Sequence, residues 1–129
     1  MSDDVFPVVL VVDDDRIQVA LLGSLLKRAG FRVYTAPSGD HAMAAMKSAG
    51  EAINVISLLV TDLDMPGING RQLAADMLSK HPALKVLYVT ANPDGLFVPG
   101  QLLGPNESFL EKPVSPANLR EAVNFLLHS

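Results

Sequence analysis

The order of apolar and helix-like segments most constrains how this 129-residue chain can fold. Short apolar runs alternate with longer segments whose apolar residues recur at helical spacing, which predicts a doubly wound α/β fold with a parallel sheet. Residues 8–12 and 58–61 are almost continuously apolar, as expected for central strands that helices cover on both faces. The expected strands are residues 8–12, 32–35, 58–61, 85–90 and 108–111.

The segments between these strands carry helix start and stop signals. Residues 16–29 place leucines on one face and are followed by Gly30, a residue typical of helix C-termini. A third helix is expected over residues 69–80, where His81 and a proline close it. Capping serines predict the starts of the second and the last helix, at Ser38 and at Ser115.

Residues 92–107 depart from this regular alternation. Three prolines and three glycines in this stretch leave no window long enough for a stable α-helix, so the helix between strands four and five is expected to be short or irregular. Half of the residues are hydrophobic, which is enough for one core without disulfides or metals. We therefore expect a single domain over residues 1–129, with its core at about residues 7–127.

Composition excludes several functional classes. The chain has no cysteine, so it has neither disulfides nor thiolate metal sites, and this is compatible with a cytoplasmic protein. Its net charge is −4 and its basic residues are scattered, which argues against nucleic-acid binding. The longest apolar runs are about five residues, whereas a membrane helix needs roughly twenty. We expect no nucleic-acid and no membrane partner.

Aspartates follow two of the expected central strands. Asp13, Asp14 and Asp15 come directly after the first strand, and Asp62 comes directly after the third. Ligands of open parallel sheets bind beyond the carboxyl ends of the strands, so these carboxylates should converge if the two strands are neighbours. Like charges at such distances repel each other or bind a cation. A few carboxylates with water and a phosphate oxygen form the ligand set that Mg²⁺ favours.

Two further polar residues end the fourth and fifth strands. Thr90 offers a hydroxyl donor and Lys112 a positive charge, and both are groups that stabilise the oxygens of a transferred phosphoryl group. Each residue alone has an ordinary explanation, because an aspartate after a strand is usually a turn former or helix cap and an isolated lysine is usually solvated. Their shared position at one edge of the sheet favours magnesium-assisted phosphoryl chemistry.

Together these segments resemble the receiver domains of response regulators, the CheY-like family. The resemblance rests on Val-Val-Asp-Asp-Asp, Val-Thr-Asp-Leu-Asp-Met-Pro-Gly-Ile-Asn-Gly, Val-Leu-Tyr-Val-Thr-Ala and Phe-Leu-Glu-Lys-Pro, in this order and at strand ends. It implies a flavodoxin-like sheet of order 2-1-3-4-5. The stretch before Lys112 and the Ser-Pro-Ala-Asn-Leu after it are more similar to receivers of hybrid sensor histidine kinases than to those of transcription factors.

The resemblance also implies a role for each site residue. Asp62 would accept the phosphoryl group, and Mg²⁺, or Mn²⁺ in its place, would be held by Asp13, Asp14, Asp62 and the backbone carbonyl of Asp64. Thr90 and Lys112 would contact the phosphoryl oxygens.

Two further residues would belong to the switch. Phe109 would be the aromatic side chain that follows the movement of Thr90, and the bond before Pro113 would be cis, although X-Pro bonds are cis in only about 5% of cases. The implied partners are a histidine kinase or phosphotransfer protein and an unidentified output partner, with a homodimer as a further option. Such a module is a signalling phosphoacceptor and catalyses only its own phosphorylation and dephosphorylation.

Two alternatives stay open. Asp13 and Asp15 have the Asp-x-Asp spacing of haloacid dehalogenase-like phosphatases, but those enzymes also need a late acidic pair, for which this chain offers only Glu111 and Glu121. The other alternative is a receiver-like interaction module that works without phosphorylation, and such a protein should ignore phosphodonors.

Overall fold

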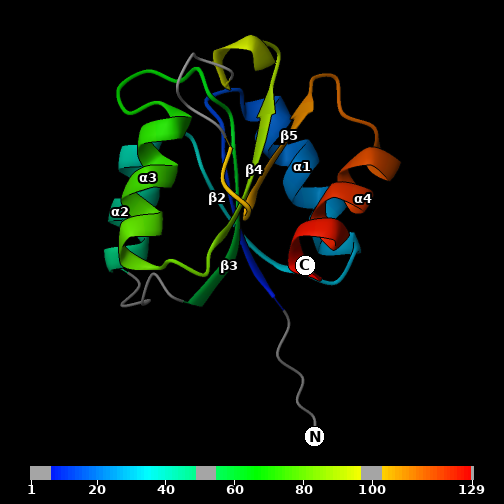
Figure 1. Cartoon of the computed structure of the whole chain (residues 1–129), viewed down its shortest axis with the longest axis horizontal. Coiled ribbons are helices and arrows are strands. Elements are labelled where there is room, and N and C mark those ends of the chain that lie inside the picture. The colour runs from blue at the N-terminus through cyan, green and yellow to red at the C-terminus, as the bar shows by residue number, and fades with distance from the viewer. Residues whose placement is uncertain (1–6, 49–54, 97–102, 129) are drawn as a thin grey trace, which may run out of the picture.

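Five parallel strands form one sheet with the spatial order β2-β1-β3-β4-β5, which confirms the predicted fold class and strand order (Figure 1). The computed structural model describes residues 7–48, 55–96 and 103–128. The first and third strands pair in parallel, with Val12 beside Thr61, so the residues that follow them emerge next to each other. The strands are β1 (Val8–Val12), β2 (Arg32–Ala36), β3 (Ile56–Thr61), β4 (Lys85–Thr90) and β5 (Glu107–Glu111).

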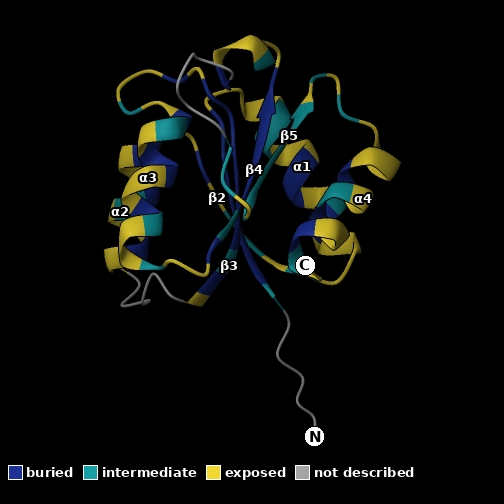
Figure 2. Cartoon of the chain, viewed as in Figure 1, coloured by how far each residue is buried: buried dark blue, intermediate teal, exposed yellow. Residues whose placement is uncertain are grey.

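Helices cover both faces of the sheet. Figure 1 shows α2 and α3 on one side and α1 and α4 on the other. Every residue of β1 is buried, whereas the edge strand β2 is mostly exposed or half-buried, because only the central strands are covered on both faces (Figure 2). The helices are α1 (Arg16–Arg28), α2 (Gly39–Ser48), α3 (Gly70–Lys80) and α4 (Pro116–Leu127).

Side-chain caps fix where the helices begin. The Asp15 carboxylate accepts hydrogen bonds from the first backbone N–H groups of α1, and Ser115 does the same for α4, where proline follows at the first helical position. Asn69 and Gln72 form a reciprocal capping box at the start of α3. The predicted helix over residues 16–29 ends at Arg28, within the ordinary uncertainty of helix boundaries.

The stretch after β4 is irregular where the structure describes it. A single 3-10 turn, η2 (Pro93–Leu96), follows β4, while residues 97–102 lie outside the described residues. Two hydrogen bonds then hold the entry to β5. Tyr88 donates to the Glu107 carboxylate at 2.8 Å, and the Gly104 N–H donates to its other oxygen at 2.7 Å. Within the described ranges, none of the helices is both long and apolar enough to cross a membrane.

Candidate phosphoryl-acceptor site

The carboxyl ends of four strands bring the predicted site residues to one edge of the sheet. Asp13 and Asp62 follow β1 and β3, Thr90 ends β4, and Lys112 follows β5. Asp13 and Thr90 are buried, and Asp62 is 9% exposed. Residues up to 99 positions apart in the sequence are therefore in direct contact, as the parallel arrangement predicts.

Three carboxylates form a potential cation site. One oxygen each of Asp13, Asp14 and Asp62 lies within 4.8 Å of the others, and Asp14 is exposed to solvent. Carboxylate oxygens are hard ligands, and a few of them at this spacing suit Mg²⁺, which keeps several water ligands. The donor set therefore fits the ion that the sequence predicts. The backbone carbonyl of Asp64 as a further ligand stays a prediction.

Lys112 connects two of these aspartates. Its Nζ donates to Asp13 Oδ2 at 2.9 Å and to Asp62 Oδ2 at 3.2 Å. Burial acts to lower the pKa of Lys112, but the hydrogen bond to Asp13 and the charges of both carboxylates outweigh it and raise this pKa. The ammonium group is thus a fixed positive charge beside the expected phosphoryl position.

Burial dominates the electrostatics of Asp13. It raises the pKa of this carboxyl above 3.8, and the hydrogen bonds from the Asp15 N–H and from Lys112 only partly counteract it. A buried carboxylate needs a positive partner, and Lys112 provides one for both Asp13 and Asp62. The exposed Asp14 adds a third carboxylate, so the cluster has more acidic than basic groups and favours cation binding.

The two oxygens of the Asp62 carboxylate have different environments. Oδ1 accepts a hydrogen bond from the Leu63 N–H at 2.7 Å and a long one from the Asp64 N–H at 3.4 Å. Oδ2 faces Lys112 at 3.2 Å. The backbone thus fixes one oxygen and the orientation of the carboxyl plane, while the other oxygen points toward the cationic side chain.

Gly70 is a residue of this site that the sequence analysis missed. A Cβ atom at this position would overlap the backbone carbonyl oxygen of Asp62 and crowd the Leu63 Cα. The Gly70 N–H also donates to the Leu63 carbonyl at 2.9 Å. The start of α3 therefore lies directly against the loop that begins at Asp62, and only glycine allows this approach. The glycine that follows Asn69 was the available signal in the sequence.

The expected switch residues lie on β4 and β5. The Thr90 hydroxyl oxygen accepts a hydrogen bond from the Asn92 N–H at 3.0 Å, and the Thr90 carbonyl accepts one from the Lys112 N–H at 2.9 Å. Phe109 is half-buried on the edge strand β5, opposite Tyr88 of β4. The Lys112-Pro113 bond is cis, as the resemblance implied.

Asp15 serves the fold rather than the chemistry. Its Oδ1 accepts from the N–H groups of Ile17 at 2.9 Å and Gln18 at 3.2 Å, so it is the N-cap of α1. The ordinary reading of an aspartate after a strand holds here. The Asp-x-Asp spacing therefore does not mark a pair of catalytic carboxylates, which removes the main support for a haloacid dehalogenase-like phosphatase.

Comparison with known proteins agrees with this geometry. The family model of the response regulator receiver domain matches residues 9–124. The chain is 32% identical over 118 residues to the transcriptional regulatory protein GlrR of Escherichia coli, covering 89% of this chain and 25% of GlrR. It is 28% identical over 120 residues to the sensor kinase CckA of Brucella abortus, covering 93% of this chain and 12% of CckA.

A solved structure supports the same likeness. The crystal structure of a response regulator receiver protein from Sinorhizobium medicae superposes with a TM-score of 0.75 at 29% identity, and 96% of each chain is covered. By contrast, the present chain spans less than a third of the two curated relatives, as the figures of 25% and 12% show.

Proposed function

Because the chain belongs to the response regulator receiver domain family of two-component signalling proteins, we propose that it accepts a phosphoryl group on Asp62. The donor is a histidine kinase or a phosphotransfer protein, and the phosphorylated state changes a surface that a partner recognises. One observation carries the proposal: the Asp62 carboxylate ends a central strand with Oδ2 at 3.2 Å from Lys112 Nζ, inside the acidic cluster.

The environment of Asp62 supports Oδ2 as the attacking atom of this proposal. Backbone N–H groups engage Oδ1, whereas Oδ2 faces the cation that would stabilise the incoming group. Oδ2 forms a bond to phosphorus as the P–N bond of a phosphohistidine donor breaks, and the imidazole leaves with the electron pair. Positioning and charge stabilisation provide most of the catalysis in such transfers.

Lys112 and Thr90 stabilise the phosphoryl oxygens. Lys112 Nζ already donates to the oxygen that becomes phosphorylated, so a short movement brings it to a phosphoryl oxygen. The Thr90 oxygen accepts from the Asn92 N–H, which leaves its hydroxyl proton available for a second phosphoryl oxygen.

Asp13, Asp14 and Asp62 would hold Mg²⁺ together with the Asp64 backbone carbonyl. A bound ion would neutralise charge on the transferred group, and Mn²⁺ would serve because it accepts the same hard oxygen ligands. Lys112 would stay beside Asp13, to which its Nζ donates at 2.9 Å.

Phosphorylation changes the surface through β4 and β5. A dianion beside Lys112 attracts the Thr90 hydroxyl, which leaves space toward which Phe109 can turn. Phe109 is half-buried on an edge strand, so its rotation alters an exposed face.

In this proposal residues 1–129 form one signalling module rather than an enzyme that acts on a separate substrate. The family match over residues 9–124 and two hydrophobic core clusters, which draw on residues from β1 to α4, support this extent. Its partners are a phosphodonor protein and an output partner, with self-association as a further possibility. Dephosphorylation by water returns the module to its resting state.

Intact mass measurement tests the function. The protein is incubated with acetyl phosphate and Mg²⁺, and we expect the mass of one phosphoryl group to be added. Asp62→Asn should abolish this gain, whereas Asp64→Asn is the matched control, because it removes an exposed carboxylate two residues away and should still be labelled. Labelling of Asp62→Asn would contradict the assignment of the acceptor. Failure of labelling by both acetyl phosphate and a phosphorylated histidine kinase would favour a phosphorylation-independent module.

A further inference from the structure

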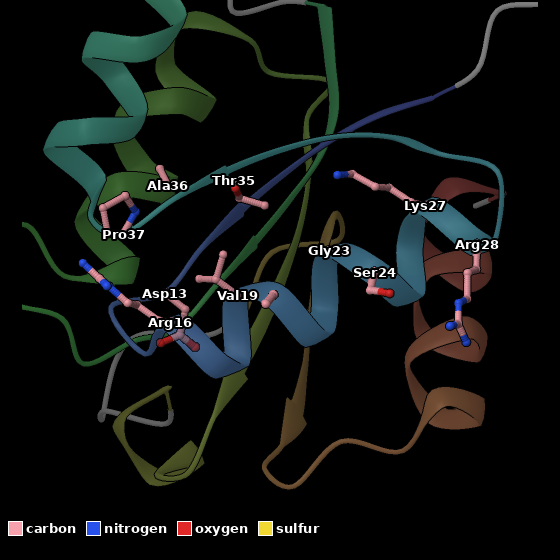
Figure 3. A pocket seen from close by; sticks show the side chains of 11 residues that line it. Asp13, Arg16, Val19, Gly23, Ser24, Lys27, Arg28, Thr35, Ala36 and Pro37 are labelled. Carbon is pink, nitrogen blue, oxygen red and sulfur yellow. The ribbon is translucent and has the colours of Figure 1, made fainter.

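A groove on the side of α1 adjoins the acceptor site at Asp13 and continues away from it along the helix. It has a volume of about 660 Å³ and runs between α1 and the edge strand β2 (Figure 3). Small residues form its floor, because Gly23 brings α1 so close to β2 that an added Cβ would lie 3.3 Å from the Thr35 side chain. The groove is lined by, among others, Arg16, Val19, Ser24, Lys27, Arg28 and Thr35.

The rim of the groove is cationic. Figure 3 shows Arg16 and Lys27 at opposite ends of α1, with Val19, Gly23 and Ser24 between them. Arg16, Lys27 and Arg28 are exposed, and no carboxylate among the described residues forms an ion pair with any of them. Asp13 is the one acid in the lining, and it is already paired with Lys112. Although the chain has a net charge of −4, the described part of this groove therefore presents three exposed cationic side chains without an ion-pair partner.

Strand β2 is an edge strand among the described residues, and it adjoins the groove at Thr35 and Ala36. The Arg32 N–H donates to the Pro7 carbonyl and the Ala36 carbonyl accepts from the Asp13 N–H, so residues 32 and 36 face β1. Backbone groups alternate in direction along a strand, which points the N–H and C=O groups of Val33 and Thr35 outward. Such an edge can pair with one more extended segment.

We propose that this groove binds an extended acidic peptide segment of a partner protein as an added strand next to β2. Arg16 and Lys27 are eleven residues apart on a helix, a rise of roughly 16 Å, and the first and fifth residues of an extended segment are roughly 13 Å apart, a difference that the long side chains can span. Acidic side chains at the first and fifth positions of the segment therefore meet the two cations. An apolar side chain at the third position lies on the same face and contacts the floor near Val19.

The positive charge of the rim favours an acidic segment over a second copy of the chain. Pairing β2 with the β2 of a copy would bring the two cationic rims together, and like charges at an interface oppose association. A basic segment is disfavoured for the same reason. An acidic extended segment can form ion pairs with the cations and hydrogen bonds with the outward backbone groups of β2.

The probe is the acetylated and amidated peptide Glu-Thr-Val-Thr-Glu. Titration followed by amide chemical shifts, without Mg²⁺ or phosphodonor, keeps the outcome independent of the proposed phosphorylation. We expect saturable binding below about 1 mM, with the largest shifts at Ser24, Val33 and Thr35. The same peptide with lysine at both ends, and one N-methylated on its central residues, should not bind.

Variants of the protein separate the groove from general charge. Arg16→Glu with Lys27→Glu should weaken binding about tenfold or more, whereas Lys47→Glu with Arg120→Glu, an equal change on other helices, should leave it within about twofold. Ser24→Trp fills the groove without a change of charge and should also abolish binding. Equal binding by either groove variant, shifts confined to other elements, or no binding at 1 mM peptide would each overturn the proposal.

Discussion

Gly70→Ala tests how closely α3 must approach the phosphoacceptor. Gly70 is the first residue of α3, and its added methyl group would overlap the Asp62 carbonyl oxygen and crowd the Leu63 Cα. Both are backbone atoms that cannot rotate away, so α3 must shift. Overpacking of this kind costs about 3 kcal/mol at the upper end of its usual range, and alanine recovers about 1 kcal/mol of helix propensity.

The expected net loss is therefore about 2 kcal/mol of the free energy of unfolding, or a fall in Tm of roughly 8 °C for a domain of this size. Labelling by acetyl phosphate should also slow, because displacement of the Asp62 backbone moves its carboxylate relative to Lys112. Urea unfolding measures the first effect and intact mass against time the second.

Gly39→Ala is the matched control, since Gly39 is the first residue of α2. Its Cβ would meet only the side chains of Ile68 and Leu73, at 3.4 to 3.6 Å, which is ordinary contact. We expect stability to stay the same or to rise by up to about 1 kcal/mol. If Gly70→Ala were as stable as Gly39→Ala and labelled at the normal rate, the close approach would not constrain the site.

Three further predictions concern the site and one helix cap. Asp13→Asn should raise Tm without divalent ions and should abolish stabilisation by Mg²⁺. Because the pKa of Asp13 is raised in the folded protein, protonation of this carboxyl stabilises the fold as pH falls through that pKa. The neutral asparagine imitates the protonated form. A lower Tm would contradict this. Lys112→Met should slow labelling at least about tenfold. Because the pKa of Lys112 is raised, its contribution to stability is present below 10.5 and lost as pH rises through the raised value; urea unfolding should show a steeper alkaline loss in the parent than in the variant. Ser115→Ala removes the cap that accepts from the Asn118 N–H at 3.0 Å and should cost about 1 kcal/mol while labelling stays normal; unchanged stability would refute a capping role.

The sheet and its acidic edge could be predicted because they depend on short-range patterns. The strand over residues 85–90 has the predicted bounds, and the continuously apolar runs identified the two central strands. Once β1 and β3 are neighbours, parallel pairing places Asp13 beside Asp62 without further information. Most of the site residues could therefore be predicted from their position at the ends of strands.

The contacts that the sequence could not provide depend on packing between distant elements. Nothing in the pattern says that Gly70 lies against the Asp62 carbonyl, because that contact follows from the angle at which α3 meets the sheet. The hydrogen bond between Tyr88 and Glu107 joins two strands whose relative register only the fold defines. Asp15 illustrates the reverse, since its spacing suggested chemistry and its geometry shows a helix cap.

The most direct test of the central claim is to locate the phosphoryl group in the chain. Borohydride reduces an aspartyl phosphate to homoserine, so reduction after incubation with acetyl phosphate and Mg²⁺, followed by peptide sequencing in the mass spectrometer, marks the acceptor. If Asp62 is the acceptor, homoserine is found at position 62 and aspartate at positions 13, 14 and 64. Homoserine at one of those three positions, or at none of the four in a protein shown to gain a phosphoryl group, would contradict this assignment.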